Sequence, residues 1–261
     1  LLQPSHHDLV EDLGMLDGYP LQSTVDALLK DPNADSARDI GYLFSLLNQK
    51  GNHNRQGRYA GTHYVNGDLF AKPAAVFMNH EELLHLRGAA EFDWRTVDPT
   101  IFGSLMEGVL GEERRERLGA HYTHESDIMK IVVPTIVRPW RERIAATKTP
   151  AAARELLDEL CEFRVLDPSC GCGNFLYVAY RELRSLEHDL KSRINSLAAS
   201  NGTPAPSTAG VYYPLSNIYG IDIENIAVLI ARVTLWMGHR QMVDRFGEAE
   251  PVLPLIDLSG I

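Results

Sequence analysis

The stretch VLDPSCGCGNFL, Val165 to Leu176, decides the fold, because it joins a short apolar run, an acid, a glycine turn and the start of a helix. The run FRVLD ends in an acid, as a buried parallel strand does. Further along the chain, NIYGID (217–222) predicts a second strand, and ENIAVLIARVTLWMGHRQMV (224–243) predicts a second helix after FLYVAYRELRSLEHDLKSRI (175–194). Strand, turn, helix, strand and helix in this order predict an α/β fold with a parallel sheet.

The two cysteines in the turn raise the possibility of a metal or redox site. Cys170 and Cys172 form one C-x-C pair, whereas structural zinc needs four ligands and a redox pair is typically C-x-x-C. Two histidine pairs elsewhere are equally incomplete. The histidines of HEELLH (80–85) are five residues apart, so they do not share a helical face, and HYTH (121–124) lacks a third ligand. We therefore predict no metal site.

The glycines of the turn favour another interpretation, a loop that holds a nucleotide-like ligand. Gly171 and Gly173 allow the backbone to approach a ligand, and the helix that follows offers free N–H groups at its N-terminus. The second strand ends in Asp222, and an acid at this position typically accepts hydrogen bonds from a ribose diol. Glu224 competes for this role. The pattern G-x-G-x-x-L lacks the third glycine of the dinucleotide fingerprint.

Composition limits the partners and the compartment. The chain has a formal net charge of −10. A surface that makes the main contacts with nucleic acid is normally basic, so we do not expect this chain to make them. An odd count of 3 cysteines argues against a disulfide framework and favours a reducing cytoplasm. No apolar run reaches the roughly 18 residues of a membrane helix, and we expect no signal peptide. The chain begins with Leu and ends within PVLPLIDLSGI, so we expect it to be a piece of a longer protein.

The residues before the parallel sheet are predicted to be helical. We expect a helical spacer over residues 1–97 and a second domain over residues 98–261. In the second domain, SDIMKIVVPTIVRPWRERIAA (126–146) predicts a helix that is capped by Ser126 or Asp127 and kinked at Pro134.

Three motifs together resemble a known enzyme family. LDPSCGCGNFL resembles motif I, the S-adenosylmethionine loop of adenine-N6 DNA methyltransferases; GAHYT (119–123) is similar to motif X, and IYGIDIE (218–224) to motif II. The order X, I, II is that of the gamma type. The segments DWRTVDPTIFGSLMEGVL and RRERLGAHYT are similar to the fused restriction–modification enzymes of the MmeI-like type IIL/IIG group. The methyltransferase resemblance covers residues 95–250.

The resemblance implies a Rossmann-like methyltransferase fold, here incomplete, that binds S-adenosylmethionine. Asp167 would face the methionine ammonium, Asp222 would hold the ribose hydroxyls, and Ile223 would touch the adenine ring. Tyr122 and Thr123 would close over the cofactor. In the turn, the backbone would lie along the cofactor, Phe175 would brace the loop, and Cys170 would be a small buried residue under it. The remaining implied contact residues are Pro168, Ser169, Cys170, Gly171, Gly173 and Phe175.

The catalytic motif of that family, [DNS]-P-P-[YFW], is missing, because the chain contains no Pro-Pro pair. The implied function is therefore the cofactor-binding portion of a bacterial, cytoplasmic enzyme that methylates adenine N6 in double-stranded DNA, with no catalytic residue in this chain. We expect these residues alone to transfer no methyl group and to bind the cofactor weakly or not at all. The alternatives are a methyltransferase for RNA, protein or a small molecule, a nicotinamide-dependent oxidoreductase with a Rossmann fold, and a non-catalytic interaction module.

Overall fold

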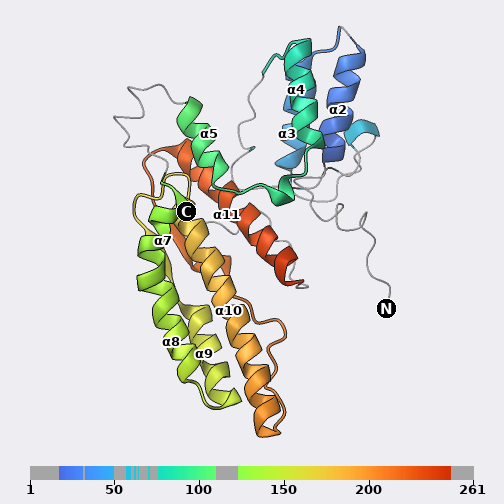
Figure 1. The fold of residues 1–261 in the computed structure, drawn as a ribbon. Helices are drawn as coiled ribbons and strands as arrows, with labels where there is room; N and C mark the ends of the chain where they lie inside the picture. Colours follow the sequence, from blue (N-terminus) through green and yellow to red (C-terminus); the bar gives the residue numbers. More distant parts are fainter. Residues whose placement is uncertain are drawn as a thin grey trace. The chain divides into compact units, whose positions relative to one another are not determined.

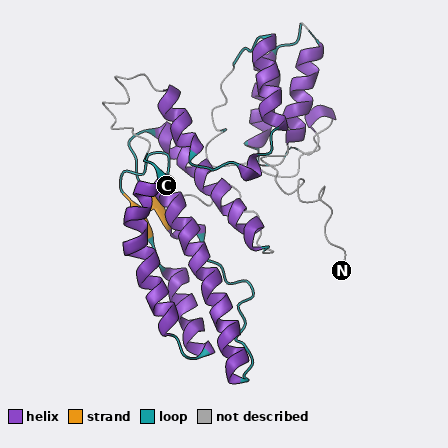
Figure 2. Ribbon diagram, viewed as in Figure 1, coloured by secondary structure: helices purple, strands orange, loops and turns teal. Residues whose placement is uncertain are grey.

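The computed structural model describes most of the chain as helices that pack in two compact units, which divide between Val97 and Asp98. The description covers residues 18–31, 33–49, 57–59, 62, 64, 70, 76–109 and 123–247. Figures 1 and 2 show the course of the chain and its secondary structure. Within the described residues, no helix is both long and apolar enough to cross a membrane.

The first unit is helical. Its helices are α2 (Gly18–Lys30), α3 (Ser36–Leu47) and α4 (His80–Glu91), with short 3-10 turns at Gly57–Tyr59 and Trp94–Thr96. Val25, Leu28, Ile40 and Leu83 form a small buried core between the three helices. Helix α4 begins with a reciprocal capping box, in which the side chains of Asn79 and Glu82 each accept a backbone N–H of the other residue.

The second unit contains the predicted strands and helices of 8 to 28 residues. Its elements, in chain order, are α5 (Ile101–Val109), α7 (Glu125–Val132), a π-helical turn (Val133–Val137), α8 (Arg138–Ala146), α9 (Pro150–Glu162), β1 (Val165–Asp167), α10 (Asn174–Asn201), a 3-10 turn (Leu215–Asn217), β2 (Ile218–Gly220) and α11 (Asn225–Phe246). Helices α7, α8, α9 and α10 run side by side, and α10 packs against each of the other three and against α11 (Figure 1).

The expected kink at Pro134 takes the form of the π-helical turn, which contains that proline. Proline cannot donate the hydrogen bond that a regular α-helix requires, so the local widening accommodates it without ending the helical path. The expected cap at Ser126 or Asp127 is wrong. The cap is His124, whose Nδ1 accepts a hydrogen bond from the Ser126 amide at 3.2 Å.

The two strands pair in parallel, as the sequence predicts, with Val165 opposite Ile218 and Asp167 opposite Gly220. Side chains before β2 fix it beside β1. The Tyr213 hydroxyl donates to the Phe163 carbonyl at 2.9 Å, and the Asn217 side-chain amide donates to the Cys161 carbonyl at 2.7 Å. Parallel pairing brings the carboxyl ends of both strands, and therefore the loops that follow them, to the same edge.

Candidate functional site

The turn after β1 is held by its own short hydrogen bonds. The Ser169 amide donates to Asp167 Oδ1 at 3.0 Å, and the Gly173 amide donates to the Cys170 carbonyl at 2.8 Å. Gly171 and Gly173 adopt φ values of +51° and +84°, which side chains other than glycine rarely adopt. The glycines predicted to shape this turn are therefore required by its backbone.

The turn after β1 is joined to the loop after β2 by backbone and side-chain bonds. The Ile221 amide donates to the Asp167 carbonyl, and the Cys170 amide donates to the Ile221 carbonyl, both at 3.0 Å. Asp222 then bridges the two loops. Its Oδ2 accepts from the Gly171 amide and its Oδ1 from the Glu224 amide, each at 2.9 Å. Asp167 and Asp222, the two acids predicted to bind a ligand, thus belong to one hydrogen-bonded edge.

The two glycines of the turn have different surroundings. A Cβ on Gly173 would lie 3.0 Å from both the Cα and the Cβ of Ala231, so Gly173 lets α11 pack against the turn. A Cβ on Gly171 would meet no heavy atom within 4 Å. The backbone of the turn is therefore closed on the side of α11 and open at Gly171, where another molecule can approach it.

Helix α10 starts in this turn, and no side chain caps its N-terminus. Asn174, the first residue of the helix, is 9% exposed, and its Oδ1 is buried without a hydrogen-bond partner. A helix N-terminus favours negative charge, and a buried amide oxygen without a partner favours a donor. The edge thus suits a polar ligand that carries both acceptors and donors, as a nucleotide-like cofactor does.

The other predicted contact residues differ in their placement. Phe175 and Thr123 are half-buried, whereas Ile223 is 85% exposed. Pro168 and Ser169 are exposed in the turn, and Cys170 is buried, as its predicted role as a filler requires. Tyr122 lies outside the described residues.

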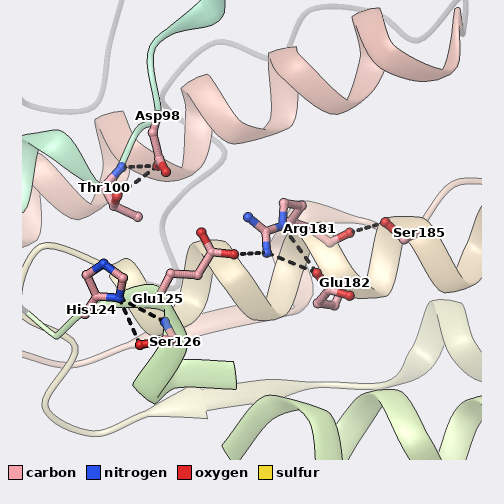
Figure 3. Close-up of polar contacts among 8 residues, drawn as sticks. All are labelled: Asp98, Thr100, His124, Glu125, Ser126, Arg181, Glu182 and Ser185. Carbon is pink, nitrogen blue, oxygen red and sulfur yellow. Dashed lines mark hydrogen bonds and ion pairs between the residues drawn. The ribbon is translucent and has the colours of Figure 1, made fainter. Parts of the chain in front are cut away.

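The residues around Thr123 are tied to α10 by an ion pair that sequence reasoning missed. Glu125, two residues after Thr123, accepts a hydrogen bond from the Arg181 guanidinium of α10 at 2.7 Å (Figure 3). The two residues are 56 positions apart and share no motif, so no signal in a single sequence pairs them.

The three cysteines lack the properties of a metal or redox site. Burial raises the pKa of the Cys170 thiol to about 12, helped by the charges of Asp167 and Asp222. Burial also raises the pKa of Cys172 to about 11, with Asp222 adding to the effect, and the pKa of Cys161 to about 11. Metal binding and disulfide exchange require the thiolate. Among the described residues, no group of three or more His, Cys, Asp or Glu side chains could hold a metal ion.

We expect the three thiols to react with iodoacetamide at least about tenfold more slowly in the folded protein at pH 8 than in urea, because the folded state keeps them protonated.

The raised pKa values of the three thiols also predict a loss of stability at alkaline pH. Unfolded thiols release protons near their usual pKa of 9.0, and the folded thiols do so only near 11 to 12. The unfolded state therefore binds fewer protons between these values, and the free energy of unfolding falls as pH rises above 9.

Mass spectrometry of the alkylated peptides measures each thiol separately, and urea unfolding at pH 8 and pH 10 measures the stability change. A thiol of the folded protein that reacts as fast as in urea would contradict the assigned burial.

Comparison with known proteins shows which proteins this chain resembles. Residues 144–261 match the family described as the DNA-methyltransferase domain of MmeI. The chain is 28% identical over 256 residues to DNA methyltransferase A of Bacillus subtilis, a match that covers 94% of this chain and 28% of that protein. It is 31% identical over 195 residues to a putative type II restriction enzyme and methyltransferase of Methanocaldococcus jannaschii, covering 62% of this chain and 16% of that protein.

A solved structure extends the comparison to the fold. The type IIL restriction–modification enzyme MmeI, solved in complex with DNA, matches with a TM-score of 0.72 and 28% identity over 96% of this chain and 36% of that chain. Residues 144–261 are thus similar to the DNA-methyltransferase domain of MmeI, and the chain as a whole resembles MmeI in fold, in line with the motifs. The chain spans about a third or less of the length of each of these relatives.

Proposed function

We propose that this chain supplies the cofactor site of an enzyme that transfers a methyl group from S-adenosylmethionine to adenine N6 in double-stranded DNA. One observation carries the proposal. The Asp222 carboxylate accepts the amides of both Gly171 and Glu224, which joins the turn after β1 and the loop after β2 into one edge with an open backbone. The relationship to DNA methyltransferases supports this reading of the edge.

The proposed contacts follow from the chemistry of each group. S-adenosylmethionine supplies an activated methyl group on a positively charged sulfur. Asp167 holds the methionine ammonium by charge, and the backbone from Pro168 to Gly173 lies along the methionine and ribose. Asp222 accepts from the ribose hydroxyls, for which a carboxylate already fixed by two amides needs little reorganisation. The side chains that enclose the cofactor are Ile223, Phe175, Thr123 and Tyr122.

We further propose that β1 and β2 belong to a larger, Rossmann-like parallel sheet within residues 98 onward, preceded by a helical spacer over residues 1–97. The exposure of Leu166 supports this, because this residue is 59% exposed although its strand, β1, packs against α10. Parallel sheets are normally covered on both faces. Ile221, directly after β2, is 58% exposed.

We propose that other parts of the full-length protein hold the target base and make most of the contacts with DNA. The net charge of −10 disfavours extensive phosphate contacts by this chain. Because the chain has no Pro-Pro pair, the residues that would hold a flipped adenine are proposed to lie outside it. A cytoplasmic location agrees with the odd count of 3 cysteines, which argues against a disulfide framework.

A labelling experiment tests the function. The full-length protein is incubated with methyl-labelled S-adenosylmethionine and duplex DNA, RNA or a protein mixture, and the DNA is digested to nucleosides. We expect label in DNA only, as N6-methyldeoxyadenosine. Label in cytosine, RNA or protein would assign a different substrate, and binding of NAD without binding of S-adenosylmethionine would overturn the cofactor.

A further inference from the structure

The ion pair between Glu125 and Arg181 connects the start of α7, which follows Thr123, with α10, which starts from the turn after β1. Glu125 is the first residue of α7 and follows Thr123 by two positions. Arg181 lies two turns into α10, the helix that begins directly after Gly173. Figure 3 shows the Glu125 carboxylate directed at the Arg181 guanidinium, with Asp98 and Thr100 nearby at the start of α5.

The surroundings of Arg181 restrict its side chain. It is 18% exposed and donates to Glu125 Oε1 at 2.7 Å and to Glu182 Oε1 at 3.1 Å. The guanidinium also lies 5.8 Å from the centre of the Tyr177 ring, within the range of a cation–π contact. Burial lowers the pKa of Arg181, but the hydrogen bond and charge of Glu125, together with the hydrogen bond of Glu182, outweigh this effect, so that the pKa is raised. Glu182 shares the helix of Arg181, so Glu125 is the partner that links two elements.

The rest of α7 has a separate anchor. Ile128 and Val132 are 0% and 3% exposed, and α7 packs against α10 along this apolar face. The helix therefore has reason to stay docked without the ion pair, because buried apolar area provides most of the stability of such a contact. The ion pair acts at the first turn, where the position of Thr123 is set.

We propose that Arg181 is a positioning residue for the cofactor, which acts through Glu125 to hold Thr123 in place relative to α10 and to the Asp167–Gly173 turn from which α10 starts. Neither Arg181 nor Glu125 touches the cofactor. The inference rests on the proposed function, because it assigns Thr123 to the same cofactor site as the turn after β1.

The test uses Glu125→Gln in the full-length protein, with Asp127→Asn as the matched control. Both changes remove one acid from the first turn of α7, but Asp127 pairs with Lys130 on its own helix at 2.6 Å. Calorimetric titration is expected to give an affinity for S-adenosylmethionine about three- to tenfold weaker for Glu125→Gln, the range of coupling between contacting residues. The control is expected to stay within about twofold of the wild type.

A double-mutant cycle identifies the pair as the cause. Once Glu125→Gln is present, Arg181→Met should weaken the affinity by less than it does alone, because the contact is already lost. Strictly additive losses would overturn the inference, and so would an unchanged affinity in Glu125→Gln.

Hydrogen exchange of the ligand-free protein separates this inference from the proposed function. The amides of residues 125–129 should exchange about fivefold faster in Glu125→Gln than in Asp127→Asn, since opening of the first turn is no longer opposed by the pair. Unchanged exchange would overturn the positioning role whether or not the cofactor binds. Normal binding by the wild type with equal affinity in Glu125→Gln would remove this inference and leave the proposed function intact.

Discussion

Replacing Gly173 by alanine is expected to destabilise the second unit by about 2 to 4 kcal/mol and to abolish binding of S-adenosylmethionine. Two costs combine. An L-residue held at φ +84° pays about 1 kcal/mol or more. The new Cβ would also lie 3.0 Å from the backbone Cα of Ala231 in α11, and overpacking of this kind costs about 1 to 3 kcal/mol. Relief requires α11 or the turn to move, and the turn is part of the proposed site.

Gly202→Ala is the matched control for this change. Gly202 ends α10 with φ +63°, and a Cβ there would meet no atom within 4 Å. It therefore carries the backbone strain without the clash and should cost only about 1 kcal/mol. Urea unfolding of both variants measures the difference. An equal decrease in the free energy of unfolding for both variants would show that the close approach of Ala231 does not contribute to the effect of Gly173→Ala.

Replacing Asp222 by alanine is expected to weaken binding of S-adenosylmethionine about a hundredfold. The change removes the acceptor proposed for the ribose hydroxyls, and hydrogen bonds to a charged group contribute about 1.5 to 3 kcal/mol each. It also frees the amides of Gly171 and Glu224, which the carboxylate now joins. The two loops then lose the side-chain bridge between them.

Glu224→Gln and Asp222→Asn provide the controls for Asp222→Ala. Glu224 is the other acid after β2 that could serve the ribose, and its replacement should change the affinity by less than about threefold. The amide of Asp222→Asn keeps one acceptor oxygen and should give an intermediate affinity. Competition with a fluorescent cofactor analogue measures all three variants. A larger loss for Glu224→Gln than for Asp222→Ala would exchange the roles of the two acids.

The sequence allowed the elements that surround the site to be predicted, for physical reasons. Short apolar runs that end in Asp167 and Asp222 predicted two parallel strands, and the structure pairs them. Parallel strands place their carboxyl ends together, so the two loops meet, and Asp222 joins them at Gly171. The roles of these residues toward a cofactor remain predictions.

Features set by contacts between distant residues could not be predicted. His124 caps α7 in place of Ser126 or Asp127, because local sequence leaves several side chains able to reach the same amides. Helix α10 continues past the predicted 194 to Asn201, where Gly202 ends it. The pairing of Glu125 with Arg181 depends on how α7 docks against α10, which no local pattern encodes.

Hydrogen exchange with and without S-adenosylmethionine tests the central claim, the location of the cofactor site, most directly. In the full-length protein, the cofactor should slow exchange in residues 169–176 and 221–224, since its proposed contacts cover both loops. Helix α4, in the other unit, should be unaffected. Binding of the cofactor that protects other segments and leaves both loops unchanged would contradict the account.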